Sequence, residues 1–198
     1  FVLKNVDKDK LYSFLREMEF NRLLSSAISK YGSASDHATK NIEKNVEKLS
    51  EIKKSNYQLI KNENEIKDWM RQSEEIGEFA IDTETTSLDP HTAKLVGISI
   101  SNRIGKACYI PLNHVNGDNL DEQKVLIILK KYLEDRSIKK IGQNIKFDFI
   151  VFYHRGIILN SMEDTMLMSY TLDAGKNRHN MDTLSEIHLG HKTIKYKD

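Results

Sequence analysis

Apolar side chains near the start of the chain recur with the spacing of one helix face. Asp7 and Gly32 are typical of the first and last positions of a helix, so the pattern predicts one helix from about residue 7 to about residue 30. Such a helix needs a partner surface that covers its apolar stripe. The stripe consists of Leu11, Phe14, Leu15, Met18, Leu23, Leu24 and Ile28.

The composition changes to Ser, Lys, Glu and Asn between residues 33 and 56. Apolar residues still recur there at helical intervals, from Ile42 to Ile52. One interpretation is a charged linker, helical when it is docked; the alternative is a solvated tether without regular structure. The sequence leaves both open, and it separates a helical segment at 1–32 from the rest of the chain.

Beyond residue 57, short apolar runs alternate with amphipathic segments. This order predicts a mixed α/β sheet covered by helices, with the helical segment as an N-terminal extension. The second, third and fourth strands are expected to form an antiparallel meander. Strands are expected at residues 57–60, 78–84, 95–101, 106–110 and 139–142. Helices are expected from Asn62 or Asn64, from Asp121, and at residues 144–154, 164–172 and 181–189, with Asp164 as a cap.

The composition is that of an ordinary water-soluble domain. The 198 residues are 39% hydrophobic and 30% charged, and the formal net charge of +1 neither supports nor excludes a nucleic-acid partner. The single cysteine, Cys108, lies in an apolar run and predicts a buried thiol in a reducing compartment. We find no signal peptide or membrane-spanning run, and therefore expect a cytoplasmic protein. Because the chain opens on Phe1, we expect a fragment of a larger polypeptide.

Two carboxylates stand two positions apart where a predicted strand ends. Asp82 and Glu84 follow the apolar run that begins at Phe79, and the turn that leaves the strand contains Pro90. Residues i and i+2 of a strand point to the same face, so the two carboxylates are expected side by side, with Thr83 on the other face. This geometry suits a shared metal ion.

A third carboxylate is expected from the segment around residues 141–148. Gly142 ends a predicted strand and Asn144 starts a predicted helix, so Asn144 and Asp148, four residues apart, are expected on one helix face. Two-metal phosphoryl chemistry uses hard oxygen ligands, which Mg²⁺ and Mn²⁺ prefer. Asp82, Glu84 and Asp148 together favour such a site.

These motifs resemble the DEDD 3′–5′ exonucleases and, within them, the proofreading domain of bacterial family A DNA polymerases. The resemblance covers residues 57–198. It rests on Phe79-Ala-Ile-Asp-Thr-Glu-Thr-Thr-Ser-Leu-Asp89, Gly142-Gln-Asn-Ile-Lys-Phe-Asp148, Glu163-Asp-Thr-Met-Leu-Met-Ser-Tyr170, His179-Asn-Met-Asp-Thr-Leu-Ser-Glu186 and His191-Lys-Thr-Ile194. The segment from Leu15 to Leu24 is similar to the tail that follows the 5′-nuclease domain in the same polymerases.

The resemblance implies a ribonuclease-H-like fold and a proofreading activity on single-stranded DNA 3′ ends. It implies that Asp82, Glu84 and Asp148 bind two Mg²⁺ or Mn²⁺ ions and that Leu88 wedges against the terminal base. The residues implied to line the single-strand groove are Thr85, Gln143, Asn144 and Phe147. An apolar wedge and an aromatic face hold frayed bases without reading their sequence. The implied partners are polymerase and 5′-nuclease domains of the same parent chain, in the bacterial cytoplasm and at the nucleoid.

The chain departs from the family at its fourth carboxylate. The family completes its site with a Tyr-x-x-x-Asp motif, and this sequence contains none; Tyr170 and Asp173 are only three residues apart. We therefore expect a C-terminally truncated exonuclease domain with an incomplete site. It is expected to bind at most one metal ion, weakly, and to have weak activity or none.

The sequence leaves two other hypotheses of function open. An RNA-processing 3′–5′ exonuclease of the same superfamily is the first alternative, and a non-catalytic nucleic-acid-binding domain is the second. For Lys139, Lys140 and Lys146, contact with phosphates and an ordinary solvated face are weighed equally.

Overall fold

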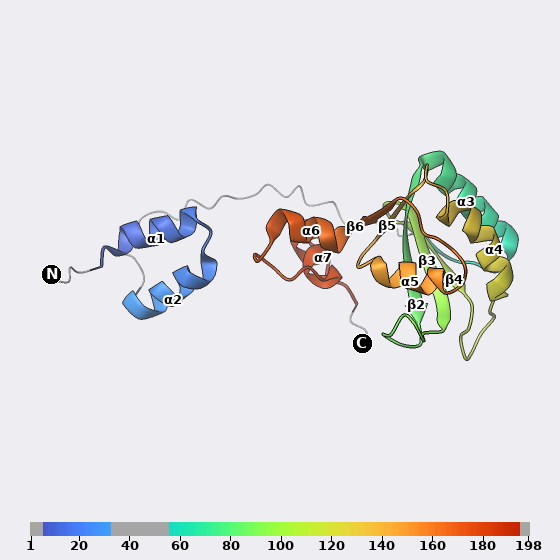
Figure 1. Cartoon of the computed structure of the whole chain (residues 1–198), viewed down its shortest axis with the longest axis horizontal. Helices are drawn as coiled ribbons and strands as arrows, with labels where there is room; N and C mark the ends of the chain where they lie inside the picture. Colours follow the sequence, from blue (N-terminus) through green and yellow to red (C-terminus); the bar gives the residue numbers. More distant parts are fainter. Residues whose placement is uncertain (1–5, 33–55, 195–198) are drawn as a thin grey trace. The chain divides into compact units, whose positions relative to one another are not determined.

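The computed structural model describes residues 6–32 and 56–194 (Figure 1). The chain divides into two compact units, residues 1–45 and 46–198. The predicted linker at 33–56 lies outside the described residues, apart from its last position. Within the described ranges, every helix is too short or too polar to cross a membrane.

The first unit contains two short helices, so the prediction of one helix from residue 7 to residue 30 is wrong. The helices are α1 (Lys8–Glu17) and α2 (Asn21–Tyr31). Between them the backbone turns through Glu19, whose φ of 56° lies in the left-handed region and cannot continue a right-handed helix. The predicted stop at Gly32 is confirmed, because α2 ends there with a φ of 83°.

The reversal at Glu19 pairs α1 with α2, but only part of the predicted apolar stripe becomes buried. Tyr12 is 1% exposed and Leu15 is 6% exposed, although both lie on a ten-residue helix that would be solvated if it stood alone. The Tyr12 hydroxyl donates a hydrogen bond to the carbonyl of Gly32 at 2.5 Å. Pairing of the two helices removes Tyr12 and Leu15 from water, whereas Phe14, Met18 and Leu23 of the predicted stripe remain exposed.

The second unit contains the predicted mixed α/β fold, built on a six-stranded sheet. Its strands are β1 (Asn56–Leu59), β2 (Glu78–Thr85), β3 (Leu95–Arg103), β4 (Lys106–Pro111), β5 (Lys139–Gly142) and β6 (Met162–Asp164). Its helices are α3 (Glu63–Ile76), α4 (Glu122–Leu133), α5 (Lys146–Tyr153), α6 (Thr165–Asp173) and α7 (Met181–Leu189). The five predicted strands are therefore confirmed within two residues at each end.

The strand order in the sheet is β1-β4-β3-β2-β5-β6. The predicted meander is confirmed, because β2 pairs antiparallel with β3 and β3 pairs antiparallel with β4. The other pairings are parallel: β1 with β4, β2 with β5, and β5 with β6. The sequence did not predict β6, since three residues are too few to show a period and its pairing with β5 depends on segments about twenty residues apart.

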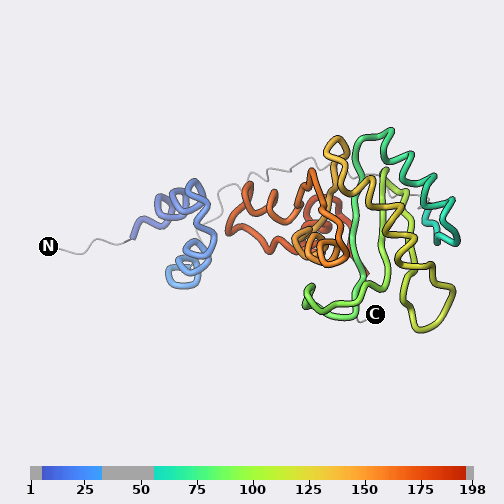
Figure 2. Tube along the Cα trace, turned by 45° about the vertical axis from the view of Figure 1, so that its right-hand side comes forward, coloured from blue at the N-terminus to red at the C-terminus, as the bar shows by residue number. Residues whose placement is uncertain are grey.

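The apolar core lies on one face of the sheet. Along β2, Phe79 and Ile81 are 1% and 2% exposed, and they belong to a cluster to which α3, α4 and α5 contribute. Cys108 lies in the same cluster, which confirms the predicted buried thiol, and burial raises its pKa to about 12. Figure 2 shows α3 and α4 on one side of the strands and α6 and α7 on the other.

The opposite face of the sheet is partly open. Ala80 and Asp82 of β2 line a cleft of about 300 Å³ there, together with Thr165 of α6 and Met181 of α7. Small side chains from β3 and β4 form the floor of this cleft: Ser99, Ser101 and Ala107. The alternation along β2 therefore places the core on one side and Asp82 in a cleft on the other.

Lys140 lies in the core, so both hypotheses for this side chain, contact with phosphates and a solvated face, are wrong. Strand alternation in β5 sends Lys139 outward and Lys140 inward, where it is fully buried. Its ammonium donates to the carbonyls of Asp135 at 2.6 Å and Ile138 at 2.7 Å, just beyond the end of α4. Burial lowers the pKa of Lys140 to about 8, because the charged form is less well solvated there than in water.

Candidate active site

The two carboxylates of β2 lie on the same face of the strand, as their spacing requires. Asp82 is partly buried and Glu84 is exposed, while Thr83 between them is buried on the core side. The register with β3 shifts between Glu84 and Thr85, which ends regular pairing just after the second carboxylate. The pair therefore lies at the tip of an inner strand of the sheet, next to the open cleft.

Asp148 reaches this strand from the first turn of α5. Its Oδ1 accepts hydrogen bonds from the Thr83 backbone N–H at 2.9 Å and from the Thr83 hydroxyl at 2.5 Å. The side chain is 3% exposed, and burial is the main reason that the pKa of Asp148 is raised. The two hydrogen bonds from Thr83 oppose this shift, because they favour the charged form.

Asp82 is the group whose ionisation is most strongly disfavoured at this site. Its pKa is raised from 3.8 to about 6, first by burial and then by the negative charges of Asp148 and Glu84. Among the described residues, the charges that act on Asp82 are those of two carboxylates, and both raise its pKa. Hard oxygen donors with excess negative charge are what a divalent cation such as Mg²⁺ requires, so these residues fit the predicted metal.

The carboxylates do not form a closed metal cage in this structure. Among the described residues, no three His, Cys, Asp or Glu side chains lie close enough together to hold a metal ion. Asp148 is turned toward Thr83, and Glu84 extends into solvent. Sequence reasoning identified the carboxylates but missed Thr83, whose hydroxyl and N–H hold the third one in place; the only signal was its position between Asp82 and Glu84.

Asn144 does not share a helix face with Asp148, so that prediction is wrong. The helix α5 begins at Lys146, and Asn144 lies before it in a turn with a φ of 58°. Its backbone N–H donates to Asp164 Oδ1 at 3.0 Å, and the next N–H, of Ile145, donates to Asp164 Oδ2 at 3.1 Å. The Asp164 carboxylate, from a distant segment, thus accepts hydrogen bonds from the two backbone N–H groups that precede α5.

Asp164 caps α6, as predicted, and it also connects α6 to this turn. The same carboxylate accepts from the N–H groups of Met166 at 2.9 Å and Leu167 at 3.4 Å, at the start of α6. Its second role was missed, since capping is a local pattern whereas the bonds to Asn144 and Ile145 span about twenty residues.

The side chains expected to line a single-strand groove have different environments. The Gln143 amide donates to the carbonyl of His179 at 2.7 Å and accepts from the hydroxyl of Thr165 at 2.5 Å, so it is already engaged within the fold. Phe147 is partly buried against the core. Thr85 donates to the carbonyl of Ser87 at 2.9 Å. Leu88, by contrast, is 95% exposed and free to contact another molecule.

Comparison with known proteins assigns most of the chain to a family. Residues 57–198 match the family described as 3′-5′ exonuclease, and the chain belongs to this family. Two of its most similar relatives are DNA polymerase I proteins. That of Rhizobium leguminosarum is 42% identical over 151 residues, covering 66% of this chain and 15% of the relative. That of Pseudomonas aeruginosa is 34% identical over 197 residues, covering 96% of this chain and 21% of the relative.

Solved structures of nucleases share the fold. Brucella melitensis NrnC with bound Mg²⁺ is 26% identical, with a TM-score of 0.54 over 72% of this chain and 64% of that chain. Escherichia coli RNase D, described as an exoribonuclease involved in structured RNA processing, is 20% identical, with a TM-score of 0.57 over 72% of this chain and 36% of that chain. The predicted ribonuclease-H-like fold is thereby confirmed. The chain spans about a fifth or less of the length of the two polymerases.

Proposed function

We propose that this chain is part of a DNA polymerase I that removes nucleotides from single-stranded DNA 3′ ends by hydrolysis, and that residues 57–198 belong to the domain that does so. The observation that carries the proposal is that Asp82 and Glu84 share one face of β2, while Thr83 between them holds Asp148 at the same strand tip. The family match and the two polymerase relatives support it. We place the activity in the bacterial cytoplasm, where the nucleoid DNA lies.

Asp82, Glu84 and Asp148 would hold the Mg²⁺ or Mn²⁺. When bound, such ions polarise the scissile phosphate and supply a nucleophilic hydroxide at neutral pH. The chain itself holds the acidic groups at fixed positions on β2 and α5, where burial and mutual repulsion favour cation binding over free ionisation. As the sequence lacks the family's fourth carboxylate, we propose that this chain binds at most one ion, weakly, and has little activity of its own.

The substrate groove is proposed to begin at Leu88. An exposed leucine at a loop tip can insert beside a terminal base without a hydrogen-bonding preference, and mismatched ends fray more readily. Thr85, Gln143, Asn144 and Phe147 are proposed as further contacts. For Gln143 and Phe147 these contacts involve groups that already hold the fold together. We further propose that residues 1–32 are the tail following a 5′-nuclease domain, and that polymerase and 5′-nuclease domains are partners in the parent chain.

The test is a double variant, Asp82→Ala with Glu84→Ala, in the full parent polypeptide. Release of nucleoside 5′-monophosphates from single-stranded DNA should fall about a thousandfold or more, because both oxygen ligands of β2 are lost. The matched control changes two exposed carboxylates of α3, Asp68→Ala with Glu75→Ala, and should leave the rate unchanged. Equal rates for the two double variants would contradict the proposal.

Two further measurements separate the alternatives. RNA 3′ ends that are cleaved as well as or better than DNA ends would favour the RNA-processing exonuclease, whose fold RNase D shares. Calorimetry that shows no Mn²⁺ binding in the parent polypeptide would favour a non-catalytic domain, since the carboxylates would then lack the role proposed for them.

A further inference from the structure

Residues 86–94 form a loop that follows β2 and carries Leu88. Its two ends are joined to each other: the N–H of Thr86 donates to the carbonyl of Lys94 at 3.0 Å, and the N–H of Lys94 donates to the Thr86 hydroxyl at 3.1 Å. These bonds close the neck of the loop, but they do not determine how the tip lies relative to the carboxylates. That orientation depends on contacts with other elements.

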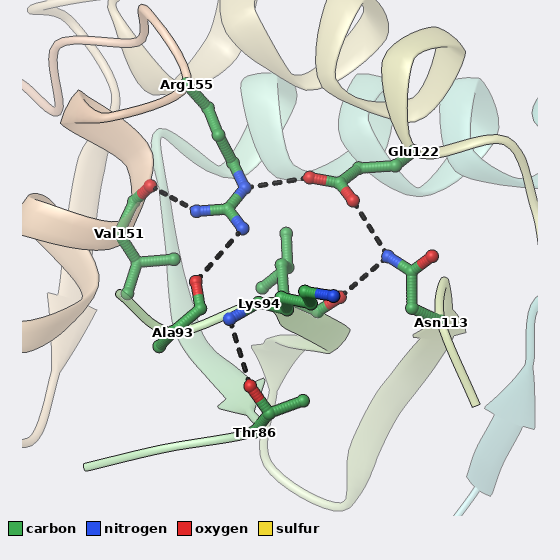
Figure 3. A network of polar contacts seen from close by, with 8 residues as sticks. Thr86, Ala93, Lys94, Asn113, Glu122, Val151 and Arg155 are labelled. Carbon is green, nitrogen blue, oxygen red and sulfur yellow. Dashed lines mark hydrogen bonds and ion pairs between the residues drawn. The ribbon is translucent and has the colours of Figure 1, made fainter. Parts of the chain in front are cut away.

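One such contact is the guanidinium of Arg155, just after α5 (Figure 3). It donates through Nη2 to the carbonyl of Ala93 at 3.4 Å and through Nη1 to the carbonyl of Val151 at 2.8 Å. Its Nε contacts Glu122 Oε1 at 2.8 Å, and Glu122 Oε2 accepts from the amide of Asn113 at 2.8 Å. One planar cation therefore joins the loop, the end of α5 and the start of α4.

The ion pair is only partly solvated. The side chains of Arg155 and Glu122 are 17% and 29% exposed. In contrast, Arg71 and Asp68 of α3 form an ion pair in which both side chains are more than 60% exposed. Exposed pairs contribute little to stability, whereas a shielded guanidinium with several acceptors is held in one orientation. Arg155 is therefore suited to fix the position of Ala93.

The residue before Arg155 holds the same loop at a second point. His154 Nε2 lies 3.0 Å from Nδ1 of His91, so one imidazole donates to the other. His154 directly follows α5, and the first turn of this helix carries Asp148, which accepts hydrogen bonds from Thr83 of β2. The loop is thus attached at its far side to the helix that carries the third carboxylate.

We propose that Arg155 and His154 are positioning residues for the exonuclease reaction: they fix the 86–94 loop, and with it Leu88, relative to Asp148, and so determine how the 3′-terminal nucleotide is held. This inference rests on the proposed function, because it takes Leu88 as a substrate contact. Neither residue touches the reacting atoms; both act through the loop.

The first experiment measures amide hydrogen exchange of residues 86–94 in the 198-residue chain. Arg155→Gln and His154→Gln should each raise exchange in the loop about tenfold, the ratio that corresponds to loss of one or two such bonds. Arg71→Gln, which removes the exposed arginine of α3, is the matched control and should change nothing there. Loop exchange in Arg155→Gln no faster than in Arg71→Gln would overturn the proposal. Should Arg155→Gln not fold, Arg155→Lys keeps the charge, lacks the fork that reaches Ala93, and should show the same direction of change.

The second experiment asks whether Arg155 acts through Leu88. Affinity is measured for a single-stranded oligodeoxynucleotide with a free 3′ end and a phosphorothioate terminal linkage. We expect Leu88→Ala and Arg155→Gln each to weaken binding about tenfold, and the double variant to be no weaker than the worse single variant. Additive losses would overturn the proposal, because Arg155 would then act by a separate route. A wild-type chain that does not bind the oligonucleotide contradicts the proposed function instead, and loop exchange then decides by itself whether Arg155 anchors the loop.

Discussion

Asp148 and Thr83, 65 residues apart in the sequence, are joined by two hydrogen bonds at the strand tip. The Thr83 N–H and hydroxyl both donate to one carboxylate oxygen, at 2.9 and 2.5 Å. This holds the third acidic group on the core side of the strand that carries Asp82 and Glu84, and it attaches α5 to β2. Thr83 and Asp148 are both buried, so each depends on the other for these hydrogen bonds. The site therefore owes its geometry to a residue that is not itself acidic.

Replacing Thr83 by valine tests this relationship. Thr83→Val keeps the shape of the side chain but removes the hydroxyl donor from a buried carboxylate, which should cost about 1–3 kcal/mol of unfolding free energy. Urea denaturation measures the change. The control is Thr171→Val, because the hydroxyl of Thr171 donates to the Leu167 carbonyl on the exposed side of α6. A cost for Thr83→Val no larger than for Thr171→Val would show that the hydroxyl does not hold Asp148.

The raised pKa of Asp82 predicts an unusual dependence of stability on pH. Since this pKa is about 6 in the folded chain and ordinarily 3.8, the folded state binds the proton more tightly than the unfolded state does. The contribution of Asp82 to stability is therefore lost as the pH rises from about 4 to about 6, and stays lost above that range.

Asp82→Asn removes this titration. In metal-free buffer the variant should match the wild type near pH 4 and exceed it by about 2 kcal/mol above pH 6, a value reduced for partial solvation of the carboxyl group. Urea unfolding at intervals from pH 4 to pH 7 measures the difference. A difference that stays constant from pH 4 to pH 7 would contradict the assignment.

Asp164 should contribute more to stability than an ordinary helix cap. Asp164→Ala removes the acceptor for two amides of the turn at Asn144 and two of α6, and we expect a loss of about 2–3 kcal/mol. Asp121→Ala removes only the cap of α4, a carboxylate that accepts a hydrogen bond from the backbone N–H of Lys124. It should lower the free energy of unfolding by about 1 kcal/mol. Thermal unfolding of both variants compares the two losses. Equal losses would mean that the bonds to the turn contribute nothing.

Lys140 and the adjacent Lys139 allow a test of what the buried ammonium group contributes to stability. Lys140→Met leaves the carbonyls of Asp135 and Ile138 without their buried donor and should cost about 1–3 kcal/mol. Lys139→Met changes the adjacent outward-facing lysine, whose ammonium lies 4.0 Å from Glu78, and should change stability by less than about 0.5 kcal/mol. Chemical denaturation of the two variants decides; a more stable Lys140→Met protein would show that the buried charge is a net cost.

The sequence by itself determined most of the secondary structure elements, the carboxylate pair and the family. Strand and helix periods are local, so the antiparallel meander and the helix caps at Asp7, Asn62 and Asp121 are read from neighbouring residues. The shared face of Asp82 and Glu84 follows from the two-residue period of any strand. Motifs that stand in a particular order along the chain also identify a family without coordinates.

Only the tertiary structure decided how distant segments share hydrogen-bonding groups. The chain turns at Glu19, where pairing of α1 with α2 buries Tyr12 and Leu15. The backbone of Asn144 leaves the helix because Asp164 accepts its N–H, and Asp148 faces Thr83 because a buried carboxylate needs donors. In each case the competing partner lies in another segment, or the gain is burial against it, and no local period records either one.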